Sequence, residues 1–173
     1  MAFYWLLSEI VINFYKNMAT EHLAIDFQKF PQDQLVELSY VSQATHEMGM
    51  LSLMNLLEDA VHKNTKAKVT GVLFYDSGIF GQILEGYPAQ LSFIWNSITA
   101  DHRHKDIEIL QIVPLQERRF ATWAMKFYGS DEISKYVPEL RVRLRGEIPA
   151  MPDEILTLMR SISNQSGEGF SAG

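Results

Sequence analysis

The sequence predicts an α+β fold of the ferredoxin-like type, in which a βαββαβ order and one short added strand build a sheet with two helices on one face. Three patterns lead to this prediction. Apolar and polar residues alternate in several stretches of strand length, and apolar residues recur at helical spacing in two stretches between them. An Asp-Ser-Gly turn at residues 76–78 joins two consecutive strands into a hairpin.

The first half of this order lies between residues 35 and 84. Residues 35–42 alternate as a strand and place Tyr40 and Ser42 on one face. A helix begins between residues 49 and 52, and its apolar stripe leads to the polar residue Asn64. Residues 69–75 and 79–84 are the hairpin strands, and Gln82 shares its face with Phe80 and Leu84.

The second half begins at Pro88, which suits a first helical turn. The apolar stripe of this second helix consists of Leu91, Ile94, Trp95 and Ile98. Residues 107–113 read as a fourth strand. A short fifth strand follows, in which Trp123, Met125 and Phe127 share one face.

Helical spacing also extends beyond this core. We predict an amphipathic helix over residues 3–18, a second short helix over 20–30 that Pro31 ends, and a C-terminal helix over 153–162. The C-terminal helix is the natural cover for the free face of the sheet, and the N-terminal helix is the other candidate. The predicted organisation is an N-terminal helical extension (1–34), a main domain (35–128) and a C-terminal helical cap and tail (129–173).

Composition narrows the function. The chain has 173 residues, a net charge of −6 and no cysteine, which excludes a thiolate metal site and a Cys nucleophile and argues against a nucleic-acid partner. Glu9 and Asn13 interrupt the N-terminal apolar run, so we expect neither a signal peptide nor a membrane span. With no cysteine in the chain, a reducing cytoplasm is the simplest expectation for its location. His102 and His104 have the spacing of metal ligands, but capping of the preceding helix is the better explanation, and no metal is expected.

Three polar side chains, Tyr40, Asn64 and Gln82, fall on the side of the sheet that the helices cover. Each has an ordinary structural explanation: a tyrosine at the rim, a helix cap and an amide at the sheet margin. Together they favour a flat polar ligand between the helices, because amide groups match the mixed donors and acceptors of a flavin edge. The sequence lacks a Gly-rich phosphate loop, so Arg103 becomes the candidate for binding phosphate.

Six motifs occur in order along the main domain. They are L-x-Y-x-S at 38–42, Asn64, T-G-V-L-F-Y at 70–75, Q-x-L-E-G at 82–86, D-x-R-H at 101–104 and R-x-F-x-x-W-x-M at 118–125. With them the chain resembles the BLUF family, blue-light sensors that bind FAD, over about residues 35–128. Gly81 departs from the family, which commonly has an aromatic residue there.

The resemblance implies FAD as cofactor and a set of binding residues. These are Tyr40, Ser42, Lys63, Asn64, Gln82, Arg103 and His104. It also implies that light drives electron and proton transfer from Tyr40 to the flavin, after which Gln82 rotates or tautomerises. Trp123 and Met125 would then transmit the change, although ordinary core packing remains an equal explanation for Trp123.

We therefore expect a short stand-alone photoreceptor, not an enzyme, that signals through an unidentified downstream protein or through a change of homo-oligomer. Two alternatives remain open from the residues alone. One is a flavoenzyme or acylphosphatase-like enzyme on the same layout, since fold does not fix function. The other is a non-photoactive adaptor for protein–protein contacts.

Overall fold

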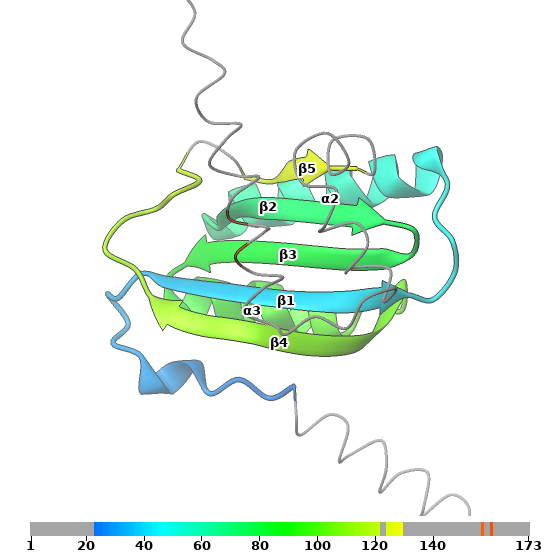
Figure 1. The fold of residues 1–173 in the computed structure, drawn as a ribbon. Coiled ribbons are helices and arrows are strands. Elements are labelled where there is room, and N and C mark those ends of the chain that lie inside the picture. The colour runs from blue at the N-terminus through cyan, green and yellow to red at the C-terminus, as the bar shows by residue number, and fades with distance from the viewer. Residues whose placement is uncertain (1–22, 122–123, 130–156, 158–159, 161–173) are drawn as a thin grey trace, which may run out of the picture.

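A computed structural model describes residues 23–121, 124–129, 157 and 160 of the chain. It contains a five-stranded sheet with two long helices, which confirms the ferredoxin-like α+β prediction (Figure 1). The elements are β1 (Val36–Ala44), α2 (Met50–Ala67), β2 (Thr70–Asp76), β3 (Ile79–Gly86), α3 (Pro88–Thr99), β4 (His104–Pro114) and β5 (Lys126–Tyr128).

The strands lie in the order β4-β1-β3-β2-β5. The central pair, β1 and β3, is antiparallel, and its register places Tyr40 opposite Gln82 and Glu37 opposite Glu85. Strand β2 is antiparallel to β3 and parallel to β5. Because successive side chains alternate between faces, the first of these cross-strand pairs points to one face of the sheet and the second to the other.

Both helices lie on the same face of the sheet (Figure 1). Helix α2 ends where Lys68 adopts a left-handed conformation (φ 57°) and returns its backbone N–H to the carbonyls of Asn64 and Thr65. Helix α3 begins with Pro88 in its first turn, and Gln90 Oε1 accepts the backbone N–H of Tyr87 at 3.0 Å. These ends fix where each helix crosses the sheet.

The core lies between the sheet and these helices. Leu38 and Leu84 from the central strands and Leu91 and Trp95 from α3 are buried together in one cluster. Gly71 shows how tightly β2 meets β3, because a Cβ atom there would lie 2.1 Å from the carbonyl oxygen of Ile83. Close strand contact at this point holds the middle of β3, where Gln82 lies, in a fixed position.

The predicted helix over residues 20–30 is wrong for the part that the structure describes. Only Phe27–Lys29 form a single 3₁₀ turn, in which the Asp26 side chain accepts the backbone N–H of Gln28 at 3.1 Å. That local bond competes with helix formation. The apolar spacing arises because Phe27 is buried against the core rather than because a helix runs through it.

The fourth strand begins at His104, earlier than its alternation predicts. Asp106 has a left-handed backbone (φ 51°), and the pairing register with β1 shifts nearby, so the alternation is broken at this end. Strand β5 comprises only Lys126–Tyr128. The predicted helix over 3–18 lies outside the described residues. In the range 153–162 the two described residues, Thr157 and Arg160, are helical.

Candidate functional site

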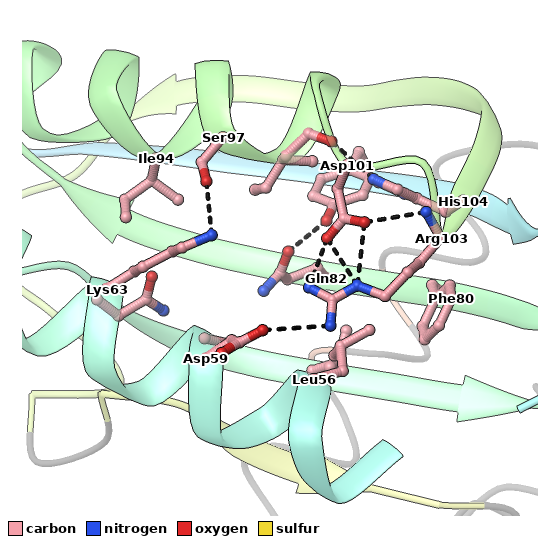
Figure 2. A pocket seen from close by; sticks show the side chains of 15 residues that line it. Leu56, Asp59, Lys63, Phe80, Gln82, Ile94, Ser97, Asp101, Arg103 and His104 are labelled. Carbon is pink, nitrogen blue, oxygen red and sulfur yellow. Dashed lines mark hydrogen bonds and ion pairs between the residues drawn. The ribbon is translucent and has the colours of Figure 1, made fainter. Parts of the chain in front are cut away.

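A cleft opens between α2 and α3 above the centre of the sheet (Figure 2). Counting its open mouth, it holds about 630 Å³ of space free of protein atoms. Its apolar lining is Leu56, Ala60, Leu73, Phe80, Ile94 and Ile98. Its polar lining is Tyr40, Asp59, Lys63, Asn64, Gln82, Ser97, Asp101, Arg103 and His104.

Tyr40 and Gln82 form a hydrogen-bonded pair at the floor of the cleft. The Tyr40 hydroxyl donates to Gln82 Oε1, and only 3% and 5% of these two residues is exposed. On its other side, Gln82 Nε2 lies 3.6 Å from the Met125 sulfur. A thioether is a weak acceptor, so the amide is held firmly on the phenol side and loosely on the Met125 side.

The surroundings of Tyr40 keep its proton in place. Trp95 packs edge-on against the phenol ring, with centroids 5.4 Å apart. Burial, with a smaller contribution from the charge of Asp101, raises the pKa of Tyr40 well above its ordinary value. The phenol is therefore a neutral hydrogen-bond donor throughout the physiological pH range.

Asn64 is buried at the end of α2, with 2% of its surface exposed. Its Nδ2 donates to the carbonyl of Ala124 at 2.8 Å, so the side chain joins the helix to the segment before β5. The helix-cap explanation is wrong, because the backbone of Lys68 closes the helix. The amide is thus fixed at its nitrogen, and its oxygen remains as an acceptor for a ligand in the cleft.

Two cations line the cleft in different electrostatic settings (Figure 2). Arg103 donates to Asp101 at 2.7 Å and to Asp59 at 3.3 Å. Burial of Asp101 opposes its ionisation, but the hydrogen bonds and charge of Arg103 outweigh this and lower the pKa of that carboxyl. Lys63 instead donates to the neutral Ser97 hydroxyl at 2.9 Å. An incoming anion would therefore meet less competition at Lys63 than at Arg103.

His104 lies between the cleft and Ser42. Its Nε2 is 2.8 Å from the Ile98 carbonyl, which can only accept, so Nε2 carries the hydrogen. Nδ1 then accepts from the Ser42 hydroxyl at 2.8 Å. Ser42 is buried beside His104 and is not among the residues that line the cleft, and its hydroxyl bonds the imidazole that does.

The structure thus brings together six residues expected from the sequence, namely Tyr40, Lys63, Asn64, Gln82, Arg103 and His104. Met125 touches Gln82, and Trp123 lies outside the described residues. Sequence reasoning missed Asp59 and Ser97. Asp59 precedes Lys63 by one helical turn on α2, and this spacing was the signal that could have placed it on the cleft face.

Two negative findings concern the described part of the chain. No group of three or more His, Asp or Glu side chains there could hold a metal ion. Among the helices described, none is long and apolar enough to cross a membrane.

Comparison with known proteins identifies the family. A family model described as "Sensors of blue-light using FAD" matches residues 35–126. The chain belongs to the BLUF family. BLUF domains are flavin-binding light sensors, and this cleft fits a flavin on chemical grounds, with aliphatic side chains for the ring faces, two amides for its polar edge and cations near the mouth.

Curated relatives carry the BLUF match inside much longer chains. The photoactivated adenylate cyclase subunit alpha of Euglena gracilis is 33% identical over 110 residues, which are 64% of this chain and 11% of that protein. The corresponding beta subunit of Euglena longa is 32% identical over 105 residues, 60% of this chain and 12% of that protein. The match therefore spans about an eighth or less of these relatives.

Solved BLUF structures share the fold. The dark-state structure of BlrB, a BLUF protein, has a TM-score of 0.69 and 26% identity, and covers 78% of this chain and 99% of its own. Klebsiella pneumoniae BlrP1, solved with FMN and cyclic diGMP, has a TM-score of 0.57 and 25% identity, and covers 77% of this chain and 35% of its own. The BLUF domain thus occurs both in short proteins and as one part of longer ones.

Proposed function

We propose that this BLUF protein is a blue-light photoreceptor that holds FAD between α2 and α3 and uses Tyr40 and Gln82 as its photoactive pair. The observation that carries the proposal is the buried hydrogen bond from the Tyr40 hydroxyl to Gln82 Oε1 at the cleft floor. A phenol can give up an electron and a proton, and a carboxamide can both accept and donate hydrogen bonds.

When bound, the flavin supplies light absorption and an electron acceptor. The chain's own groups do the rest. The Tyr40 proton has a path to Gln82 Oε1 along the existing bond. A half-turn of the Gln82 amide exchanges its oxygen and nitrogen, and this costs little on the far side because the Met125 sulfur is a weak acceptor. Gln82 therefore has a second bonding arrangement, in which Nε2 donates to the Tyr40 oxygen and Oε1 is free to accept from another donor.

Asn64 and Lys63 have supporting roles in this proposal. Because Asn64 Nδ2 is fixed on the Ala124 carbonyl, its oxygen is oriented to hold the ligand's polar edge. Lys63, beside a neutral serine, is placed to receive a phosphate, whereas Arg103 is already engaged by two carboxylates.

Release of the flavin by heat, followed by chromatography against FAD, FMN and riboflavin standards, distinguishes the three cofactors.

The decisive experiment is an absorption spectrum of the purified protein before and after blue light. We expect a yellow protein with a small, reversible red shift. Tyr40→Phe and Gln82→Leu should retain flavin and lose the shift, because each removes one end of the proton path. Tyr75→Phe and Gln43→Leu are matched controls: Tyr75 is a buried tyrosine outside the cleft and Gln43 an exposed residue of β1. A normal shift in either test variant would contradict the assignment.

We further propose that the signal leaves through a separate effector protein or through a change of oligomer. Large apolar side chains in the first turns of α2 support such a contact, since Met50, Leu51 and Met54 are 79%, 77% and 58% exposed. Light scattering on the dark and illuminated protein tests the oligomer arm. An unchanged mass directs the search to a separate partner.

A further inference from the structure

The sheet face away from the cleft carries a second cross-strand pair. Glu37 on β1 lies directly opposite Glu85 on β3, and both are completely buried. Like charges opposite each other on a sheet destabilise it, and a buried carboxylate needs compensating partners. Something must therefore neutralise this pair.

Glu85 is neutralised by the chain segment that precedes β5. The backbone N–H groups of Arg119 and Phe120 donate to its two oxygens at 3.0 and 3.1 Å. Thr70 Oγ1 donates at 3.2 Å, and Arg119 Nε lies 3.7 Å from Glu85 Oε1. The guanidinium of Arg118, bonded to the Glu85 backbone carbonyl at 2.5 Å, adds a further positive charge.

Glu37 has a different set of partners. Its two oxygens form ion pairs with the guanidinium groups of Arg119 and Arg160. Arg160 also donates to Gln111 Oε1 on β4 at 2.9 Å. Among the described residues, one of the two cations that neutralise Glu37 thus lies 123 residues away in sequence, whereas the partners of Glu85 all lie within 35 residues of it.

Burial makes this arrangement sensitive to the loss of any one partner. It raises the pKa of Glu85 and lowers the pKa values of Arg119 and Arg160. Removing one member of a buried ion pair leaves an uncompensated charge, which costs far more than the pair itself contributes. Without Arg160, the one described cation that Glu37 retains is Arg119, and Arg119 is shared with Glu85.

The carboxylate pair shares its strands with the photoactive pair. Glu37 and Tyr40 lie on β1, and Glu85 and Gln82 lie on β3, in one continuous register. The segment that holds Arg119 runs on to Met125, which contacts Gln82 on the opposite face. A change of bonding at Gln82 that shifts Met125 or the β1–β3 spacing therefore acts on the positions of both carboxylates and of Arg119.

We propose that the Glu37–Arg160 ion pair is the releasable contact that reports the state of the Tyr40–Gln82 pair to the C-terminal segment. In the dark, Arg160 is bonded to Glu37 and Gln111 on the sheet. In the light, movement of Arg119 and β1 weakens the ion pair, and Arg160 separates from Glu37 more often. The inference rests on the proposed photoreceptor function, and it makes Arg160 a positioning residue rather than part of the flavin site.

Hydrogen exchange measured by mass spectrometry on the flavin-loaded full chain, in the dark and under blue light, tests this. In the wild type, peptides containing Arg160 should exchange roughly five-fold faster or more in the light. Arg160→Gln should exchange at the illuminated rate already in the dark and gain little from light. Arg160→Lys, which retains the charge, should recover part of the light response. Lys105→Gln, at an exposed position of β4, should behave as the wild type.

The outcomes separate the two proposals. The absorption shift should be intact in Arg160→Gln. If the wild type shifts its spectrum but hydrogen exchange at Arg160 does not change, the inference is overturned and the proposed photoreceptor function is unaffected. The same conclusion follows if Arg160→Gln shows the wild-type light response in hydrogen exchange. A wild type without any spectral shift overturns both. If Arg160→Gln does not fold, the charge-balanced double variant Glu37→Gln/Arg160→Gln is measured instead. A light-induced change of hydrogen exchange in its peptides that contain position 160 would contradict the inference.

Discussion

Each face of the central β1–β3 pair carries one buried polar cross-strand pair, and the two pairs differ in charge and in hydrogen bonding. On the cleft face, Tyr40 and Gln82 are neutral and share one strong hydrogen bond, with a weak sulfur contact beyond it. On the other face, Glu37 and Glu85 are charged and are surrounded by guanidinium and backbone N–H donors. Both pairs are buried to nearly the same extent.

The difference shows how one sheet can hold a movable pair and a fixed pair at equal burial. A neutral amide that changes partner exchanges one hydrogen bond for another, at a cost of about 1 kcal/mol or less. A buried carboxylate that loses its cation costs about 3–5 kcal/mol. The cleft face is therefore suited to rearrangement, and the ionic face to holding the strands in register until a partner is withdrawn.

The largest difference between the two faces is expected in the stability of Glu85→Leu. The substitution removes one of the two carboxylates that Arg119 contacts and leaves two buried backbone N–H groups without an acceptor. We expect the free energy of unfolding to fall by about 3–5 kcal/mol in a denaturant titration, while the folded fraction keeps its light-induced shift. Glu108→Leu, at an exposed site of β4, should change it by about 0.5 kcal/mol or less. Equal effects of the two substitutions would contradict a fixed ionic face.

A smaller effect is expected on the cleft face from Asn64→Ala. It removes the bond to the Ala124 carbonyl and should lower the free energy of unfolding by about 1–2 kcal/mol. It should also weaken flavin retention on a desalting column, because the amide oxygen that faces the ligand is lost. Asn96→Ala, exposed on α3, is the matched control and should alter neither quantity. Undiminished flavin retention in Asn64→Ala would remove Asn64 from the binding site.

The sequence predicted the cleft face better than the ionic face, for a physical reason. Strand alternation and helical spacing are local patterns, and they place Tyr40, Gln82 and Asn64 on the helix-covered side. The ionic face depends on which residue lies opposite Glu37 and on where Arg119 and Arg160 arrive from distant segments. No local period encodes such contacts, and alternation alone marks Glu37 and Glu85 only as polar residues on the other face.

Local bonds explain the remaining differences. Residues 20–30 have apolar spacing, but in the described part the Asp26 side chain closes a single turn and ends any helix. The start of β4 lacks alternation because Asp106 has a left-handed backbone. Asp59 and Ser97 were missed because their partners are distant in sequence. The fold brings Arg103 to Asp59 and Lys63 to Ser97, and no local pattern predicts either contact.

The smallest effect concerns pH, and it tests whether Tyr40 is neutral in the dark. Burial, and to a lesser degree Asp101, place the pKa of Tyr40 in the folded protein above its unfolded value of 10.0. The stability linked to this proton is therefore complete below pH 10 and falls as the pH rises beyond it. Between neutral pH and about pH 10 the light-induced shift should keep its amplitude, because the phenol keeps the proton that it must give up.

Asp101→Asn is the matched variant for this titration. It removes the negative charge that adds to the effect of burial, so it should lower the pKa of Tyr40 while burial still holds it above the ordinary value. Ultraviolet absorption of tyrosinate, recorded with the light-induced difference spectrum along the same pH series, measures both quantities. A difference spectrum that fades with a midpoint near or below pH 10 in the wild type would mean that burial does not raise the pKa of Tyr40, and the contrast between a closed neutral pair and a fixed ionic pair would then fail on the cleft side.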